Sequence, residues 1–105
     1  MRYEIILAPS AARALRALSA RRHAELRDAI EAHLRQEPKR VSTSRIKRLR
    51  GVTRPQYRLR VGEMRVFYDV TTTEVLVLAI VTKAEAQSWL EQKGVDDEGG
   101  RAGEG

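Results

Sequence analysis

The chain has 105 residues, a formal net charge of +6 and no cysteine. This length allows one domain with a modest core, and the lack of cysteine excludes disulfides and cysteine-containing zinc sites. The longest apolar run, Val75 to Val81, suits a strand and is too short for a membrane span. Because no signal-peptide pattern follows Met1, we expect a soluble, cytoplasmic protein. No cofactor is expected.

Positive charge is concentrated between Lys39 and Arg65. This stretch holds ten Lys or Arg residues and one acid, Glu63, a net of +9 in 27 residues, whereas the other 78 residues carry a net of −3. Charge concentrated in this way indicates a surface for nucleic acid or for an acidic partner. The alternative is a solvated basic loop.

The N-terminal half predicts one strand and two helices. Residues 2–7 alternate between polar and apolar side chains, as a strand does. Pro9 suits the first turn of a helix that reaches about Leu18. Ser19 is expected to cap a second helix that reaches about Gln36, and the two helices would cover a sheet as a helical hairpin. Residues 39–54 have no clear period and predict a basic loop.

Residues 57–70 alternate in two halves around Gly62-Glu63, a pattern typical of a β-hairpin with a two-residue turn. This register gathers the aliphatic side chains on one face and puts Arg58, Arg60 and Arg65 on the other. Arg60 then stands directly across from Arg65, and such a like-charge pair costs stability. The arrangement therefore favours a face that binds a polyanion.

The C-terminal part predicts an interior strand, a helix and a tail. Residues 75–82 are apolar on both faces, as in a central strand. A short helix follows over residues 83–93, with Gly94 as its cap. We expect one domain over residues 1–93 and a disordered tail over residues 94–105. The predicted order is β-α-α-β-β-β-α, an α+β fold with helices on an antiparallel sheet.

Other chemically interesting residues favour structural roles. His23 and His33 are ten residues apart on one helix and cannot share a face. Trp89 is expected to pack on the sheet, and Tyr57 and Tyr68 are expected in the core. The sequence contains no metal-ligand spacing, phosphate-binding glycine loop or nucleophile motif.

Two segments resemble a known family. The basic run Lys47-Arg-Leu-Arg-Gly51 and the hairpin Tyr57-Arg-Leu-Arg-Val-Gly-Glu-Met-Arg-Val-Phe-Tyr68, after a strand and two helices, are similar to the RelE/ParE superfamily of bacterial toxins. The resemblance covers about residues 2–93. It implies a toxin of a type II toxin–antitoxin pair, neutralised by a cognate antitoxin.

The RelE branch of this superfamily implies an endoribonuclease that cuts mRNA on the ribosome. A ribose 2′-hydroxyl would attack the adjacent phosphate, and Arg58, Arg60 and Arg65 would bind the phosphate oxygens. Arginine is a poor general base because its charge is permanent. Lys83 is the first candidate for proton transfer, and Glu63, the ribosome or the RNA are others.

Further residues are expected to contact RNA. The basic run would grip ribosomal RNA, and an aromatic residue among the arginines could stack a base. These candidates are Lys47, Arg48, Arg50 and Phe67.

The resemblance also implies the binding partners of the protein and an alternative function. The expected partners are the antitoxin, mRNA and ribosomal RNA, with operator DNA bound only by the toxin–antitoxin complex and no membrane. Trp89 falls where RelE-type toxins often carry a tyrosine. The alternative is a non-catalytic member, either a ParE-like inhibitor of DNA gyrase or a nucleic-acid-binding protein.

Overall fold

The computed structural model describes residues 2–96 of the chain. The predicted α+β class and order of elements are confirmed, and three short strands are added to them. The elements are β1 (Glu4–Leu7), α1 (Pro9–Ala17), α2 (Ala20–Leu34), β2 (Ile46–Arg48), β3 (Val52–Arg54), β4 (Tyr57–Val61), β5 (Met64–Val70), β6 (Glu74–Thr82), α3 (Lys83–Lys93) and β7 (Val95–Asp96).

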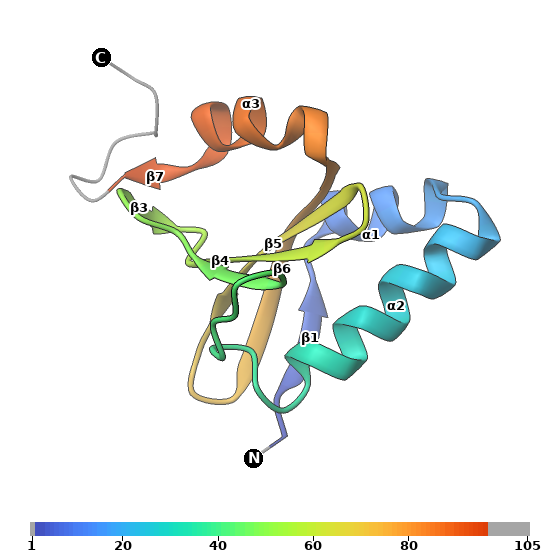
Figure 1. Ribbon diagram of the computed structural model, residues 1–105, viewed down its shortest axis with the longest axis horizontal. Helices are drawn as coiled ribbons and strands as arrows, with labels where there is room; N and C mark the ends of the chain where they lie inside the picture. Colours follow the sequence, from blue (N-terminus) through green and yellow to red (C-terminus); the bar gives the residue numbers. More distant parts are fainter. Residues whose placement is uncertain (1, 97–105) are drawn as a thin grey trace.

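Five strands form one sheet in the order β1-β6-β5-β4-β2, and β3 pairs with β7 in a second sheet (Figure 1). β1 runs parallel to β6, and the other neighbours in the large sheet are antiparallel. The large sheet is therefore mixed, whereas the prediction had it antiparallel throughout. Short turns make β4, β5 and β6 antiparallel, but a long stretch of chain links β1 to β6, and such a connection permits a parallel pair.

The hairpin of β4 and β5 has the predicted register. Val61 pairs with Met64, and Arg60 pairs with Arg65. Gly62 has a φ of 56°, a conformation that glycine adopts without steric cost and that two-residue hairpin turns require. The alternation of side chains and this glycine together fix which face each residue occupies.

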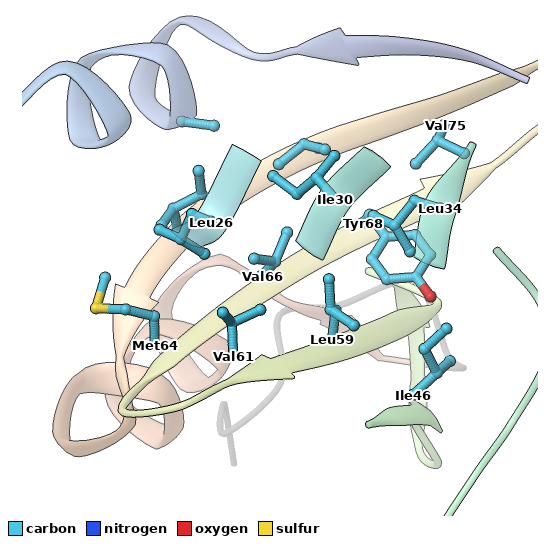
Figure 2. Close-up of a cluster of buried hydrophobic side chains, with 13 residues drawn as sticks. Leu26, Ile30, Leu34, Ile46, Leu59, Val61, Met64, Val66, Tyr68 and Val75 are labelled. Carbon is cyan, nitrogen blue, oxygen red and sulfur yellow. The ribbon is translucent and has the colours of Figure 1, made fainter. Parts of the chain in front are cut away.

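The core lies between the sheet and the helical hairpin. Figure 2 shows α2 side chains directed at the inner face of β4 and β5. The buried residues at the centre of this cluster are Leu26, Ile30, Leu34, Leu59, Val66 and Tyr68. Full burial of one such aliphatic side chain contributes about 1.5–3 kcal/mol. Tyr68 is buried as predicted, stacks on half-buried Tyr57, and donates its hydroxyl to the Pro38 carbonyl at 2.6 Å.

Helices α2 and α3 begin at side-chain caps, whereas α1 begins at Pro9 without one. The Ser19 hydroxyl accepts the Arg22 N–H at 3.3 Å, so its predicted capping role is confirmed. Thr82 and Glu85 form a capping box at the start of α3, which satisfies N–H groups that a helix leaves without partners. Within residues 2–96, no helix is long and apolar enough to cross a membrane.

Two predicted irregular segments contain short strands. In the predicted loop, Ile46 is 3% exposed and pairs with Leu59, so one apolar anchor extends the sheet by β2. In the predicted tail, Val95 pairs with Arg54 as part of β7, so the ordered structure continues past Gly94. Residues 97–105 of the predicted tail lie outside the described residues.

Candidate nucleic-acid interface

The outer face of the large sheet, opposite α1 and α2, carries a cluster of cations. Alternation along β4 and β5 directs Arg58, Arg60, Arg65 and Phe67 away from the core. Lys47 on β2 pairs with Arg58, and Arg60 pairs with Arg65. Because paired residues on one face have Cβ atoms about 4.5–5.5 Å apart, these four cations form one cluster, which we call the arginine face.

Helix α3 covers the part of the outer face that belongs to β5 and β6. Trp89 of α3 stacks on Phe67, with ring centroids 4.9 Å apart and planes 6° from parallel. Phe67 is 0% exposed. The prediction that Trp89 packs on the sheet is confirmed, whereas the prediction that Phe67 is available to stack a base is wrong, because α3 covers its ring.

Arg65 lies at the margin of this cover. It is only 6% exposed, and its Nη1 donates to the carbonyls of Gly62 and Met64 at 2.8 and 2.9 Å. Its strand partner on β6 is Val81, two residues before α3 begins. Arg65 therefore does not project into solvent with the other predicted phosphate-binding arginines, since its guanidinium is turned back to hold the hairpin turn.

Arg58 is half-buried beside the other two arginines. Its Nε is fully buried and has no hydrogen-bond partner among the described residues. Burial lowers the pKa of the Arg58 guanidinium, and the charges of Arg65 and Arg60 lower it further. A buried N–H without a partner costs about 1–3 kcal/mol, and an anionic oxygen is the acceptor that such a cluster favours.

Arg60 and Lys83 are both exposed. The Arg60 N–H donates to the Arg45 carbonyl at 2.9 Å, which ties β4 to the residue before β2. The Lys83 N–H donates to the Glu63 carbonyl at 2.7 Å. The hairpin turn and the start of α3 are thus fastened together, and Lys83 stands at the turn end of the arginine face.

The three basic residues 47, 48 and 50 take different positions. Lys47 belongs to the arginine face, as described above. Arg48 points to the other side, where its guanidinium lies 5.2 Å from the centre of the Tyr57 ring and donates to the Gln56 carbonyl at 2.8 Å. Arg50 is exposed beside Gly51, which has a φ of 73°.

A partly buried network that the sequence analysis missed fastens β3 and β4 to β5. The Asp69 carboxylate accepts the Gln56 N–H at 2.8 Å and the Arg54 Nε at 3.0 Å. The Gln56 side chain in turn accepts the Val70 N–H at 2.8 Å. Burial raises the pKa of Asp69, and the Gln56 bond and the nearby arginines Arg54 and Arg48 oppose that change.

The histidines and acids offer no second site. Burial lowers the pKa of His33, and Arg45 adds to this effect. The carboxylate in the same pocket, Glu37, is paired with Arg40 at 3.0 Å. Glu63 is exposed in the hairpin turn. Among residues 2–96, no three His, Cys, Asp or Glu side chains gather in a way that suits a metal ion.

Comparison with protein families decides the classification. The family described as "ParE toxin of type II toxin-antitoxin system, parDE" matches residues 5–87. The chain belongs to this family. It is a toxin of the type II toxin–antitoxin class, and the resemblance to the RelE/ParE superfamily is confirmed.

Solved structures of related toxin–antitoxin complexes share the fold of this ParE-family chain. The toxin–antitoxin complex RelBE2 from Mycobacterium tuberculosis includes a chain that is 26% identical with a TM-score of 0.64; the match covers 78% of this chain and 99% of that one. The archaeal RelE–RelB complex from Pyrococcus horikoshii OT3 gives 27% identity, a TM-score of 0.57 and coverages of 79% and 97%. The RelB–RelE complex from Methanococcus jannaschii, at 16% identity and a TM-score of 0.60, shows the fold alone.

No curated protein sequence matches this ParE-family chain. The family match contains the hairpin and Lys83 but ends at residue 87, before Trp89 and β7. The arginine face therefore lies within the part of the chain that defines the family, whereas the Phe67–Trp89 stack reaches beyond it.

Proposed function

We propose that this ParE-family toxin is an endoribonuclease that cuts mRNA on the ribosome. The observation that supports this proposal is the buried, unpartnered Nε of Arg58 beside two further guanidiniums. A sheet face gains nothing from three adjacent cations unless an anion joins them. A phosphate of RNA supplies the missing acceptor.

The proposed reaction needs charge stabilisation and two proton transfers. The 2′-oxygen forms a bond to phosphorus, the bond from phosphorus to the 5′-oxygen breaks, and a cyclic phosphate and a 5′-hydroxyl result. Arg58 and Arg60 hold the phosphate oxygens as negative charge grows on them. Arg65 keeps the hairpin turn in place, and its positive charge stabilises the phosphate without a direct contact to the RNA.

Proton transfer is assigned to Lys83, with Glu63 as the second candidate in the chain. Both residues are exposed at the turn end of the arginine face, where the backbone bond between them fixes their separation. The proton leaves the 2′-hydroxyl, and a proton must reach the departing 5′-oxygen. Groups of the ribosome or of the RNA can serve as the other partner in this exchange.

We expect Lys47 and Arg50 to bind ribosomal RNA. Lys47 extends the arginine face toward the edge of the sheet, and Arg50 projects from the turn between β2 and β3. Arg48 is already used by Tyr57 and Gln56, so we expect it to contribute through the shape of this turn.

A cognate antitoxin is the expected protein partner, since the related structures are toxin–antitoxin complexes. Its binding segment should be acidic or amphipathic and should cover the arginine face or displace α3. Operator DNA is expected to bind only the toxin–antitoxin complex.

The second candidate function is inhibition of DNA gyrase without RNA cleavage. The match to the ParE family favours it, as does Trp89 in place of a tyrosine, because an indole has no proton to exchange in acid–base catalysis. The arginine face would then bind an acidic surface of a protein.

One experiment separates the two candidates. Purified toxin is added to translating ribosomes, and mRNA cuts are mapped for the wild type, Arg58→Ala and Lys83→Ala; gyrase supercoiling is measured in parallel. We expect ribosome-dependent cuts that Arg58→Ala removes. Intact mRNA together with blocked supercoiling would transfer the assignment to gyrase.

A further inference from the structure

A second pocket lies between α3, β6 and the start of α1. Its volume is about 370 Å³, and it is lined by Ser10, Arg54, Leu78, Trp89 and Lys93. The register shift between Phe67 and Tyr68 leaves Leu78 of β6 without a β5 partner. The Ser10 hydroxyl donates to the Leu78 carbonyl at 3.2 Å, which fixes the start of α1 against this irregularity.

The pocket combines apolar walls with a cationic rim. Leu78 and the indole of Trp89 provide the walls, and the indole is held in place by its stack on Phe67. The bond from Arg54 to Asp69 at 3.0 Å orients the guanidinium at the rim. Lys93, in the last turn of α3, is exposed and makes no ion pair within residues 2–96.

These walls and cations suit a ligand that has a flat ring and an anionic group. Aromatic side chains stack on bases of any sequence, and Arg and Lys side chains bind phosphate oxygens. A volume of about 370 Å³ is large enough for one nucleotide. The pocket is separated from Arg58 by the Phe67–Trp89 stack, so it is distinct from the arginine face.

From this geometry we infer that the pocket beside Trp89 binds a single nucleotide, with its base against Trp89 and Leu78 and its phosphate on Lys93 and Arg54. The inference goes beyond the proposed function, because nucleotide binding here needs no cleavage. The nucleotide is either free or part of an RNA chain, and the two sources share this chemistry.

Trp89 is the only tryptophan in the chain, so its fluorescence reports on the pocket. UMP and AMP are titrated into the full chain, and we expect a fluorescence change with a Kd on the order of 1 mM. Lys93→Ala should weaken binding about tenfold, because it removes one charge-assisted contact. Lys39→Ala, the loss of an exposed lysine away from the pocket, should leave the Kd unchanged.

A second titration identifies the source of the nucleotide. If the trinucleotide UpUpU binds more tightly than UMP and Arg60→Ala removes the gain, the pocket receives a nucleotide of an RNA chain that also reaches the arginine face. If UpUpU and UMP bind equally, the pocket receives a free nucleotide. Either result supports the pocket, and neither depends on ribonuclease activity.

Three results would overturn the inference. The first is no fluorescence change with either nucleotide, and the second is equal weakening by Lys93→Ala and Lys39→Ala. The third is inorganic phosphate competing as strongly as UMP, since the site would then recognise an oxyanion alone. A peptide that alternates glutamate and phenylalanine serves as a further competitor, and its binding without nucleotide binding would assign the pocket to a protein partner.

Discussion

The two halves of the outer sheet face differ in cover rather than in sequence pattern. On β4 and β2, Arg58, Arg60 and Lys47 are exposed or half-buried, whereas on β5 Arg65 and Phe67 are buried beside or beneath α3. Alternation assigns all five residues to the same face. The open half is thus available to a ligand, and the covered half supports it.

This difference shows how one pair of arginines divides its roles. Arg60 and Arg65 are cross-strand partners, yet Arg60 projects into solvent and Arg65 donates to two carbonyls of the hairpin turn. Removal of an exposed cation that stands beside a second cation should change the free energy of unfolding little. Removal of a buried donor lowers it, because the acceptors are left without a partner. Substitutions in the two halves should therefore have opposite profiles for stability and activity.

The largest expected effect on stability is in the covered half. Phe67→Ala removes a fully buried ring and leaves Trp89 without its stacking partner, so the free energy of unfolding should fall by about 4 kcal/mol. Urea unfolding followed by circular dichroism measures this loss. Val41→Ala is the matched control, because Val41 is 58% exposed and its loss should stay within about 0.5 kcal/mol. A loss below about 1 kcal/mol for Phe67→Ala would show that α3 is not firmly docked.

The next effect concerns Arg65. Arg65→Ala removes the donor for the Gly62 and Met64 carbonyls, and the free energy of unfolding should fall by about 2–3 kcal/mol. Arg65→Lys should recover part of this loss, since lysine keeps the charge but not the fixed geometry of a guanidinium. The same urea series measures both variants. A fully stable Arg65→Ala that has lost RNA cleavage would instead place Arg65 in contact with the RNA.

Much of the fold could be predicted from sequence patterns, because the contacts involved are local. The hairpin register follows from alternation and Gly62, and the start of α2 follows from Ser19. The burial of Arg65 and Phe67 was not predictable in this way. It depends on where α3 lies, and an alternating pattern does not record which face a distant helix covers.

The same limit explains the missed contacts around the basic segment. Arg48 stands two residues after buried Ile46, so the two side chains share a face of β2. That spacing was the available signal that Arg48 lies away from the arginine face. The bonds from Gln56 and Arg54 to Asp69 join residues on different strands. Such pairs become visible only once the strands are placed side by side.

A smaller effect is expected from the ionisation of Asp69. Because burial raises its pKa in the folded chain above the ordinary 3.8, the folded state holds the proton to higher pH than the unfolded state does. The Asp69 contribution to the free energy of unfolding should therefore fall as pH rises from about 4 through the folded pKa. The free energy of unfolding is measured for the wild type and for Asp69→Asn across this pH range. The difference between them isolates Asp69, because the other carboxylates titrate in both proteins. If the wild type instead gains stability over Asp69→Asn as the pH rises, the expected sign is wrong.

The smallest effect on stability should accompany a large effect on function. Arg60→Ala removes an exposed side chain and relieves repulsion with Arg65, so the free energy of unfolding should change by less than about 0.5 kcal/mol. RNA cleavage should fall about 100- to 1,000-fold, the usual cost of losing one donor to a charged transition state. Arg13→Ala, an exposed arginine on α1 at the other side of the sheet, is the control for net charge and should retain full cleavage. Equal losses of cleavage in both variants would mean that the overall positive charge, and not the arginine face, binds the RNA. A loss of cleavage confined to Arg60→Ala would separate the ligand-binding half of the face from the half that supports it.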